Sequence, residues 1–279
     1  MNRRFDFLIV GSGIAGLSFA LKVAAHGTVC IISKTSLDET NTRYAQGGIA
    51  AVTYSPDSYE KHVADTLETG SGLCNEEIVR LVVTQGPNQI NELVNWGTSF
   101  DKKPNGMFDL AKEGGHSEHR VLHHKDNTGY EIQMALGKKV REHKNITILE
   151  KYFGIDLITP HQLGETIQRG QDTISCFGIY ALNIKSNEIK TILAKITFIA
   201  TGGAGNIYQT TTNPPIATGD GLAMVYRAKG IIENLEFVQF HPTALYNPKE
   251  KPSFLITEAM RGFGAILKTS NGKEFMLKY

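Results

Sequence analysis

Gly11-Ser12-Gly13-Ile14-Ala15-Gly16 has the pattern GxGxxG and directly follows a short apolar run, Phe5-Asp6-Phe7-Leu8-Ile9-Val10. The run is rich in residues that favour β-structure, which predicts a buried strand. Residues 14–25 then carry apolar side chains at helical spacing, and residues 28–32 form a second apolar run. This order predicts a parallel βαβ unit with the glycines at the turn from the first strand into the helix.

The glycine positions in this turn are typical of dinucleotide binding. Gly11 allows the tight turn, Gly13 lets backbone N–H groups approach a pyrophosphate, and Gly16 lets the helix pack closely on the strand. The positive end of the helix dipole then stabilises the anion. The same hexapeptide also occurs in turns with a purely structural role, so the flanking strand and helix carry the assignment.

The composition favours a small-molecule partner. Among 279 residues, 29 Lys and Arg nearly balance 28 Asp and Glu, which argues against nucleic acid or an anionic membrane as a partner. Cys30, Cys74 and Cys176 are too far apart in the sequence to indicate a disulfide framework or a thiolate metal site. No apolar run at the start has the length of a signal peptide or a membrane span, so we expect a cytoplasmic protein.

The end of the second predicted strand departs from the usual dinucleotide pattern. An acidic residue that holds the ribose hydroxyls normally stands there, whereas this chain has Ser33-Lys34. Two explanations stay open at this point. A cation can accept the 2′-phosphate of NADP, or a flavoprotein can hold the ribose through other residues.

Three later glycine segments favour a long cofactor. Residues 42–51 read TRYAQGGIAA, residues 198–203 read FIATGG, and residues 218–221 read TGDG at the start of an apolar helix. Each segment alone is compatible with a strand end or a capping turn. Together with the βαβ unit, the three segments predict a cofactor that contacts four separate loops.

Two further helices are predicted in the middle of the chain. Residues 75–96 have apolar side chains near helical spacing, and Gly86-Pro87 is expected to kink or split that helix. A second helix follows Thr128-Gly129 and extends to about residue 143.

Three short β-type runs follow these helices, at residues 147–151, 176–184 and 190–200. The turn at residues 185–187 predicts that the last two runs form a hairpin. We interpret these strands as an α+β insertion.

The glycine segments belong to a longer series of motifs. AQGGIAA (45–51), ATGGAG (200–205), TTNP (211–214), GDG (219–221), QFHPTAL (239–245) and TEAMRGFGA (257–265) occur in this order. The order and spacing of these motifs resemble those of the flavoprotein family of fumarate reductase, succinate dehydrogenase and L-aspartate oxidase over nearly the whole chain. The resemblance implies an α/β fold with a Rossmann-like FAD-binding domain over residues 1–234. It also implies an inserted α+β capping domain, of which only the start, residues 235–279, is present.

The resemblance also implies the contacts with FAD. The pyrophosphate is expected at Ser12 to Ala15, the adenosine at Lys34, and the isoalloxazine at Asn41 to Gly48. Members of membrane complexes carry a histidine covalently bonded to the flavin where this chain has Asn41, so FAD is expected to be noncovalent. The implied FAD-binding residues are Gly11, Ser12, Gly13, Ile14, Ala15, Gly16, Ser33, Lys34, Asn41, Thr42, Arg43, Tyr44, Ala45, Gln46, Gly47, Gly48, Thr201, Gly202 and Asp220.

The substrate end of the site is implied by the last two motifs. His241, Thr257 and Glu258 resemble the residues of the family that bind substrate carboxylates. Arg261 lies one helical turn from Thr257 and is expected to orient Glu258. A histidine beside a proline more often has a structural role, and only its place in QFHPTAL favours a functional one.

Glu113, in Lys112-Glu113-Gly114-Gly115-His116-Ser117, separates the members of the family. The segment resembles the aspartate-oxidising members, whereas succinate and fumarate enzymes generally carry an aromatic residue at this place. A carboxylate there repels a dicarboxylate, but it pairs with the α-ammonium of aspartate through a charge-assisted hydrogen bond worth about 1.5–3 kcal/mol. The alternative is that Glu113 is an exposed loop acid.

The four histidines near this segment match no closed tetrahedral spacing, so no metal is expected. They are His116, His119, His123 and His124.

The implied reaction is oxidation of L-aspartate to iminoaspartate, with oxygen, which gives hydrogen peroxide, or fumarate as electron acceptor. The imine leads to quinolinate and NAD, which makes quinolinate synthase a candidate partner. A soluble fumarate reductase or succinate dehydrogenase flavoprotein subunit and a noncatalytic FAD-binding module are the alternatives. The family's catalytic arginine and last FAD-binding glycines lie beyond Tyr279, so residues 1–279 alone are expected to be inactive.

Overall fold

The structure is a computed structural model that describes residues 3–169, 174–262 and 264–278. The chain forms two compact units, residues 1–44 with 130–254 and residues 45–129 with 255–279. These units are defined by contacts within the chain, whereas the predicted division into residues 1–234 and 235–279 marks the boundary of an inserted domain. That boundary stays a prediction.

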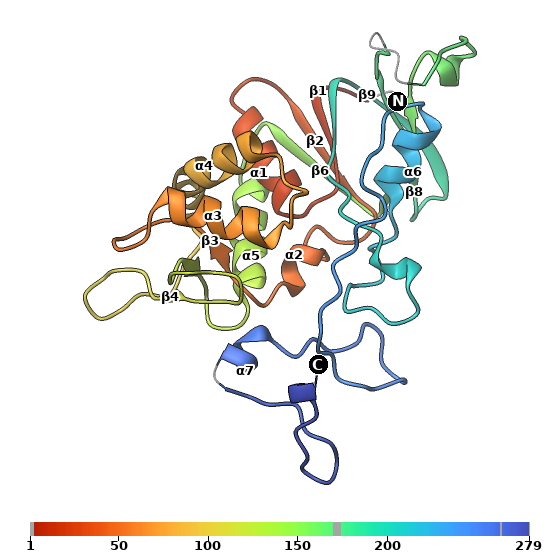
Figure 1. The fold of residues 1–279 in the computed structure, drawn as a ribbon. Coiled ribbons are helices and arrows are strands. Elements are labelled where there is room, and N and C mark those ends of the chain that lie inside the picture. The colour runs from red at the N-terminus through yellow and green to blue at the C-terminus, as the bar shows by residue number, and fades with distance from the viewer. Residues whose placement is uncertain (1–2, 170–173, 263, 279) are drawn as a thin grey trace. The chain divides into compact units, whose positions relative to one another are not determined.

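A six-stranded sheet is the centre of the first unit (Figure 1). The strand order is β6-β2-β1-β9-β8-β7. Neighbouring strands from β6 to β9 are parallel, and β8 and β7 are antiparallel to their neighbours. The strands are β1 (Arg3–Val10), β2 (Val29–Ser33), β6 (Ile146–Glu150), β7 (Tyr152–Ile158), β8 (Gly178–Asn183) and β9 (Glu188–Ile199).

The predicted βαβ unit is confirmed. Helix α1 (Ile14–Val23) connects β1 to the parallel strand β2, and Val10 pairs with Ile32 at the ends of the two strands. All five residues of β2 are buried, and Leu8 and Ile9 of β1 have no exposed surface. Strands that are buried on both faces are continuously apolar, which is why the sequence predicts these two strands.

The predicted hairpin is also confirmed, but the interpretation of these strands as an insertion is wrong. Strands β8 and β9 pair as antiparallel neighbours around the turn at 184–187. Strand β9 also pairs in parallel with β1, with Ile199 opposite Val10, so it belongs to the central sheet. A hairpin turn predicts only the pairing of the two strands that it joins. The other partner of β9 is β1, which lies almost 200 positions earlier in the sequence.

The predicted helices are present, and Pro87 does not split the first of them. Helix α4 (Glu76–Asn95) is continuous through Pro87, and α5 (Thr128–Arg141) follows as expected. A proline inside a helix removes the hydrogen bond to the carbonyl four residues earlier. In α4 this loss is offset by packing, since Val83, Ile90 and Leu93 are buried on one face.

The remaining elements are short, apart from one helix that the sequence pattern did not reveal. This helix, α3 (Tyr59–Thr69), begins after Ser58, whose hydroxyl accepts the N–H of Lys61. The second unit contains α3, α4 and a small antiparallel sheet in the order β3-β5-β4. The short elements are α2 (Asn41–Tyr44), β3 (Ile49–Ala50), β4 (Leu110–Ala111), β5 (Val121–Leu122), α6 (Asp220–Arg227), α7 (Glu258–Gly262) and three 3-10 turns at His161–Leu163, Gly205–Ile207 and Met276–Lys278. Among the described residues, no helix has the length and hydrophobicity needed to cross a membrane.

Candidate functional site

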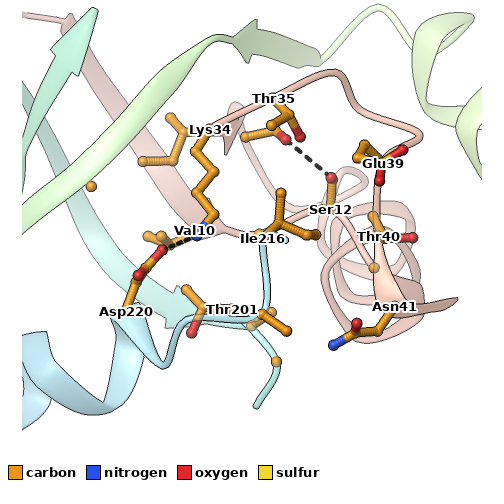
Figure 2. A pocket seen from close by; sticks show the side chains of 18 of the residues that line it. Val10, Ser12, Lys34, Thr35, Glu39, Thr40, Asn41, Thr201, Ile216 and Asp220 are labelled. Atoms are coloured by element: carbon orange, nitrogen blue, oxygen red, sulfur yellow. Dashed lines mark hydrogen bonds and ion pairs between the residues drawn. The ribbon is translucent and has the colours of Figure 1, made fainter. Parts of the chain in front are cut away.

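A cavity lies in the first unit at the carboxyl ends of β1, β2 and β9 (Figure 2). It encloses about 950 Å³ of space that is partly open to solvent. In open α/β sheets, ligands bind at the carboxyl ends of the parallel strands. Twelve of the predicted FAD-binding residues line the cavity: Gly11, Ser12, Gly13, Ile14, Ala15, Ser33, Lys34, Asn41, Thr42, Thr201, Gly202 and Asp220.

The geometry of the glycine turn confirms the backbone roles of Gly11 and Gly16. Gly11 has a φ of +110°, and a Cβ atom at this position would lie 2.2 Å from the carbonyl oxygen of Ala200. A Cβ atom on Gly16 would lie 2.2 Å from the carbonyl oxygen of Gly11. The turn therefore fits between β9 and α1 only because both residues lack a side chain.

The start of α1 provides N–H groups for an anion. Gly13 precedes the helix and has no side chain that can cap it. The first turn of a helix leaves N–H groups without partners inside the helix. The Ile14 N–H donates to Thr42 Oγ1 at 3.0 Å. The start of a helix favours a negatively charged group such as a pyrophosphate.

Lys34 and Asp220 form an ion pair on one side of the cavity, as Figure 2 shows. Lys34 Nζ lies 2.6 Å from Asp220 Oδ2 and donates to Thr218 Oγ1 at 2.7 Å. An acidic side chain, which is absent from the end of β2, is therefore present at the cavity from the start of α6. Asp220 neutralises Lys34 and would repel a 2′-phosphate, which argues against the NADP alternative.

Asn41 contributes an unpaired acceptor to the cavity. Its Oδ1 atom is buried and has no hydrogen-bond partner among the described residues. Buried polar atoms are nearly always paired, so this oxygen fits a donor supplied by a ligand. The glycine turn, the start of α1 and Asn41 are together compatible with FAD.

Other predicted cofactor residues of the first unit do not line the cavity. Gly16 packs behind the turn, Arg43 lies over the ring of Tyr130 at 5.3 Å, and the Tyr44 hydroxyl donates to Glu39 at 2.9 Å. Their contacts with FAD stay predictions.

Residues Ala45 to Gly48 belong to the second unit. The close backbone approach expected for the paired glycines is present, but its partner is protein. A Cβ atom on Gly48 would lie 2.2 Å from the carbonyl oxygen of Leu122 in β5. The Gln46 amide donates to the carbonyl of Leu255 at 3.2 Å. Whether this segment also contacts FAD stays a prediction.

Four of the predicted substrate residues gather within the second unit, around the carboxylates of Glu113 and Glu258. The Gly114 N–H donates to Glu258 Oε1 at 3.2 Å, and Arg261 Nη2 lies 3.6 Å from Glu258 Oε2. The Thr257 hydroxyl donates to Asp126 at 2.8 Å. Arg261 and Glu258 therefore form an ion pair, and the orienting role of Arg261 stays a prediction.

Glu113 is half-buried, unlike an ordinary exposed loop acid. Burial raises the pKa of Glu113, the nearby Glu258 carboxylate raises it further, and His123 opposes both effects. Two carboxylates that share a partly dry space favour a cation between them.

His241 lies in the first unit and is half-buried. Its Nδ1 atom lies 2.8 Å from the carbonyl oxygen of Thr243 and 3.2 Å from the Thr243 nitrogen. This local turn leaves the Nε2 atom of the ring as the one that can act on a ligand.

Sequence reasoning missed a buried arginine next to the Glu113 segment. Arg120 has no exposed surface. It donates to both Asp57 oxygens at 2.7 and 2.9 Å, to Asp65, and to Ser117 Oγ at 3.3 Å. Burial alone would raise the pKa of Asp65, but hydrogen bonds from Ser117 and Arg120 outweigh it and lower the pKa to about 2. The only hint in the sequence is an arginine that directly precedes the apolar pair of β5.

Each of the four histidines of this region has a partner within the protein. Arg120 Nη1 donates to His116 Nδ1 at 3.2 Å, and burial, followed by Arg120, lowers the pKa of His116. The Nδ1 atoms of His119 and His124 lie 3.2 and 2.8 Å from the carbonyls of Leu110 and Ser99, and His123 lies 3.2 Å from Asp101. In the described part of the chain, no group of three or more His, Cys, Asp or Glu side chains is arranged to hold a metal ion.

Residues 6–279 match a protein family that is described as "FAD binding domain". The chain belongs to this FAD-binding family. An L-aspartate oxidase from Nicotiana tabacum is 49% identical over all of this chain and 43% of its own length. L-aspartate oxidase 1 from Ralstonia nicotianae is 48% identical over 98% of this chain and 50% of its own length.

The FAD-binding chain also resembles solved structures. A quinol fumarate reductase structure from Escherichia coli superposes with a TM-score of 0.87 at 30% identity, over all of this chain and 46% of that one. The chain spans about half the length of the curated relatives it matches. The shared family confirms the predicted α/β FAD-binding fold and FAD as the cofactor.

Proposed function

We propose that the full-length protein oxidises L-aspartate to iminoaspartate, with FAD held at the cavity beside the glycine turn. The observation that carries the proposal is the half-buried Glu113 next to Glu258. The names of the curated relatives support it. When bound, FAD would supply the acceptor for the hydride from the substrate Cα, the substrate ammonium would lose a proton as the C=N bond forms, and oxygen or fumarate would take up the electrons.

The predicted substrate residues have distinct parts in this proposal. Glu113 accepts hydrogen bonds from the α-ammonium of aspartate, and Thr257 binds a substrate carboxylate. Arg261 holds Glu258 beside them. His241 is the further carboxylate ligand, through its Nε2 atom. The product is an imine that quinolinate synthase consumes in NAD synthesis, in a cytoplasmic location.

The charge of the Glu113 pair favours aspartate over succinate. A substrate ammonium relieves the repulsion between Glu113 and Glu258, whereas succinate brings only further negative charge. A charge-assisted hydrogen bond of about 1.5–3 kcal/mol corresponds to a preference of about 10- to 150-fold. The likeness to quinol fumarate reductase favours a fumarate reductase or succinate dehydrogenase as the second candidate.

Anaerobic mixing of the full-length holoprotein with each substrate tests the proposal. L-aspartate is expected to bleach the visible absorbance of the flavin, and succinate is not. Bleaching by succinate instead would establish the second candidate. A yellow protein that neither substrate bleaches would be a noncatalytic FAD-binding module.

We expect Glu113→Gln to lower kcat/KM for L-aspartate oxidation by about 10- to 150-fold, because the amide keeps the shape but loses the charge that pairs with the ammonium. Fumarate reduction with an artificial electron donor should not fall, since fumarate has no ammonium and the removed charge repelled the dicarboxylate. Glu118→Gln is the matched control, because Glu118 lies in the same loop and pairs with Lys61. Equal losses in both activities of Glu113→Gln would remove the ammonium assignment.

The raised pKa of Glu113 predicts how activity depends on pH. The carboxylate must be ionised to bind the ammonium, so kcat/KM for aspartate falls as the pH is lowered through the pKa of Glu113. Because burial and Glu258 raise this pKa, the fall begins at a higher pH than for an ordinary glutamate. A pH profile of kcat/KM should show this limb in the wild type, and the limb should be missing in Glu113→Gln.

FAD is proposed to be noncovalent, because the amide nitrogen of Asn41 is not a nucleophile. Precipitation of the holoprotein with acid should leave the yellow colour in the supernatant, and the denatured polypeptide should have the mass of its sequence alone. A polypeptide that carries the added mass of the flavin would contradict this.

A further inference from the structure

Gln133 is a fully buried polar residue of α5 that lies behind the FAD cavity without lining it. Its Nε2 atom donates to the carbonyl oxygens of Ser12 and Leu37, both at 3.0 Å. Its Oε1 atom accepts from the Thr40 hydroxyl at 2.9 Å. Both N–H groups and the oxygen of the amide are therefore used, and only one amide orientation satisfies all three partners.

The three partners belong to the two segments that form one wall of the cavity. Ser12 is in the glycine turn, whereas Leu37 and Thr40 lie in the segment between β2 and α2. In Figure 2, Ser12, Thr40 and Asn41 lie on the side of the cavity away from Asp220. Neither segment is in regular secondary structure at these residues, so Gln133 replaces the hydrogen bonds that a sheet or helix would provide.

The bond to Ser12 also fixes the direction of a neighbouring donor. In a trans peptide the C=O of one residue and the N–H of the next point in opposite directions. Gln133 holds the Ser12 carbonyl, so the Gly13 N–H must point away from Gln133. Gly13 lines the cavity, and its N–H is one of the groups that approach a pyrophosphate in this type of turn.

The bond to Thr40 has a similar effect on α2. The Thr40 hydroxyl accepts the N–H of Arg43 at 3.1 Å and so caps this short helix. Asn41 and Thr42, the first residues of α2, line the cavity. Gln133 therefore connects the glycine turn to the helix that carries Asn41.

We propose that Gln133 is a positioning residue for FAD, which prearranges the Gly13 N–H and the start of α2 before the cofactor binds. The residue acts through the backbone and does not touch the ligand. The inference depends on FAD binding alone and is independent of the substrate that the protein oxidises.

The test compares FAD affinity and apoprotein stability in full-length variants. We expect Gln133→Leu to raise the Kd for FAD about 10- to 100-fold. The carbonyls of Ser12 and Leu37 lose their donor, so the glycine turn and the segment before α2 are no longer held in one conformation. The Kd is measured by quenching of FAD fluorescence on titration with apoprotein, and the Tm of each apoprotein is measured alongside.

Asn145→Leu is the matched control. The Asn145 amide also donates to a backbone carbonyl, that of Ala24 at 2.9 Å. It lies directly before β6, at the opposite ends of the parallel strands from the cavity. This variant should lose thermal stability and keep the Kd for FAD within about twofold. An equal rise of the Kd in both variants, or no rise in Gln133→Leu, would overturn the proposal.

Two milder variants keep the proposal testable even where Gln133→Leu fails to fold. Thr40→Val removes one of the three bonds together with the cap of α2, and it should raise the Kd for FAD by a smaller factor. Gln133→Glu keeps the acceptor for Thr40, but only its protonated form can donate to a carbonyl. Its FAD affinity should therefore improve as the pH falls, relative to the wild type at each pH. A Kd for Gln133→Glu that follows the wild type at every pH would also overturn the proposal.

Discussion

Gly11→Ala should abolish FAD binding and destabilise the protein by at least about 3 kcal/mol, the sum of backbone strain and a steric clash. The φ of +110° disfavours any residue with a Cβ atom. The added methyl group would also lie 2.2 Å from the Ala200 carbonyl oxygen, which belongs to the backbone at the end of β9 and cannot rotate away. The measurements are urea unfolding of the apoprotein and FAD titration.

Gly72→Ala separates the two causes. Gly72 also has a left-handed φ, +84°, but a Cβ atom there would meet no atom within 4 Å. This control should therefore show the strain alone, about 1–2 kcal/mol, with an unchanged Kd for FAD. Equal destabilisation in the two variants would show that the contact with Ala200 is not the cause.

The second large effect is expected for Arg120→Met. The arginine is fully buried, and its removal leaves the Asp57 and Asp65 carboxylates without their cation. Breaking a buried ion pair by removing one partner costs about 3–5 kcal/mol, because the remaining charge stays desolvated. Urea unfolding at neutral pH measures this loss.

Arg80→Met is the matched control, since Arg80 also pairs with two acids, Glu60 and Glu76, but is half exposed. Its loss should cost less than about 1 kcal/mol. If the two variants lose equal stability, the burial of Arg120 has no energetic importance.

The loss in Arg120→Met should depend on pH in a defined direction. The pKa of Asp65 is lowered to about 2 in the folded protein, below the value of about 3.9 for an unfolded aspartate. A lowered pKa stabilises the fold above the unfolded pKa, and this contribution is lost as the pH falls toward 2. The difference between wild type and variant should therefore be largest near neutral pH and shrink below about pH 4.

The sequence predicts the fold best where the pattern is local. The apolar runs of β1 and β2, and the glycines between them, lie within about 30 residues and define the βαβ unit. The pairing of β9 with β1 was not predictable in this way, because a hairpin turn carries no information about a third strand. The continuous helix through Pro87 also depends on packing that a propensity rule does not include.

In the candidate site, too, the sequence predicts local features better than contacts between distant residues. Lys34 and Asp220 were each assigned to the cofactor, but their ion pair joins residues 186 positions apart and becomes visible only in the structure. Glu258 meets the Gly114 N–H across 144 positions. Gln133 and Arg120 were missed because their importance comes from burial, and a single glutamine or arginine in a sequence gives no sign of it.

The contact between the glycine turn and the end of β9 has a consequence for biosynthesis. Gly11 and Ala200 are adjacent in space, but the ribosome makes them about 190 residues apart, which takes about 10 to 40 s at ordinary elongation rates. During that interval the emerging polypeptide has the pyrophosphate loop without the strand that supports it. FAD can therefore bind only late in the synthesis of this protein, after β9 has been made. Until then the apolar strands β1 and β2 lack β9 as the next strand of their sheet.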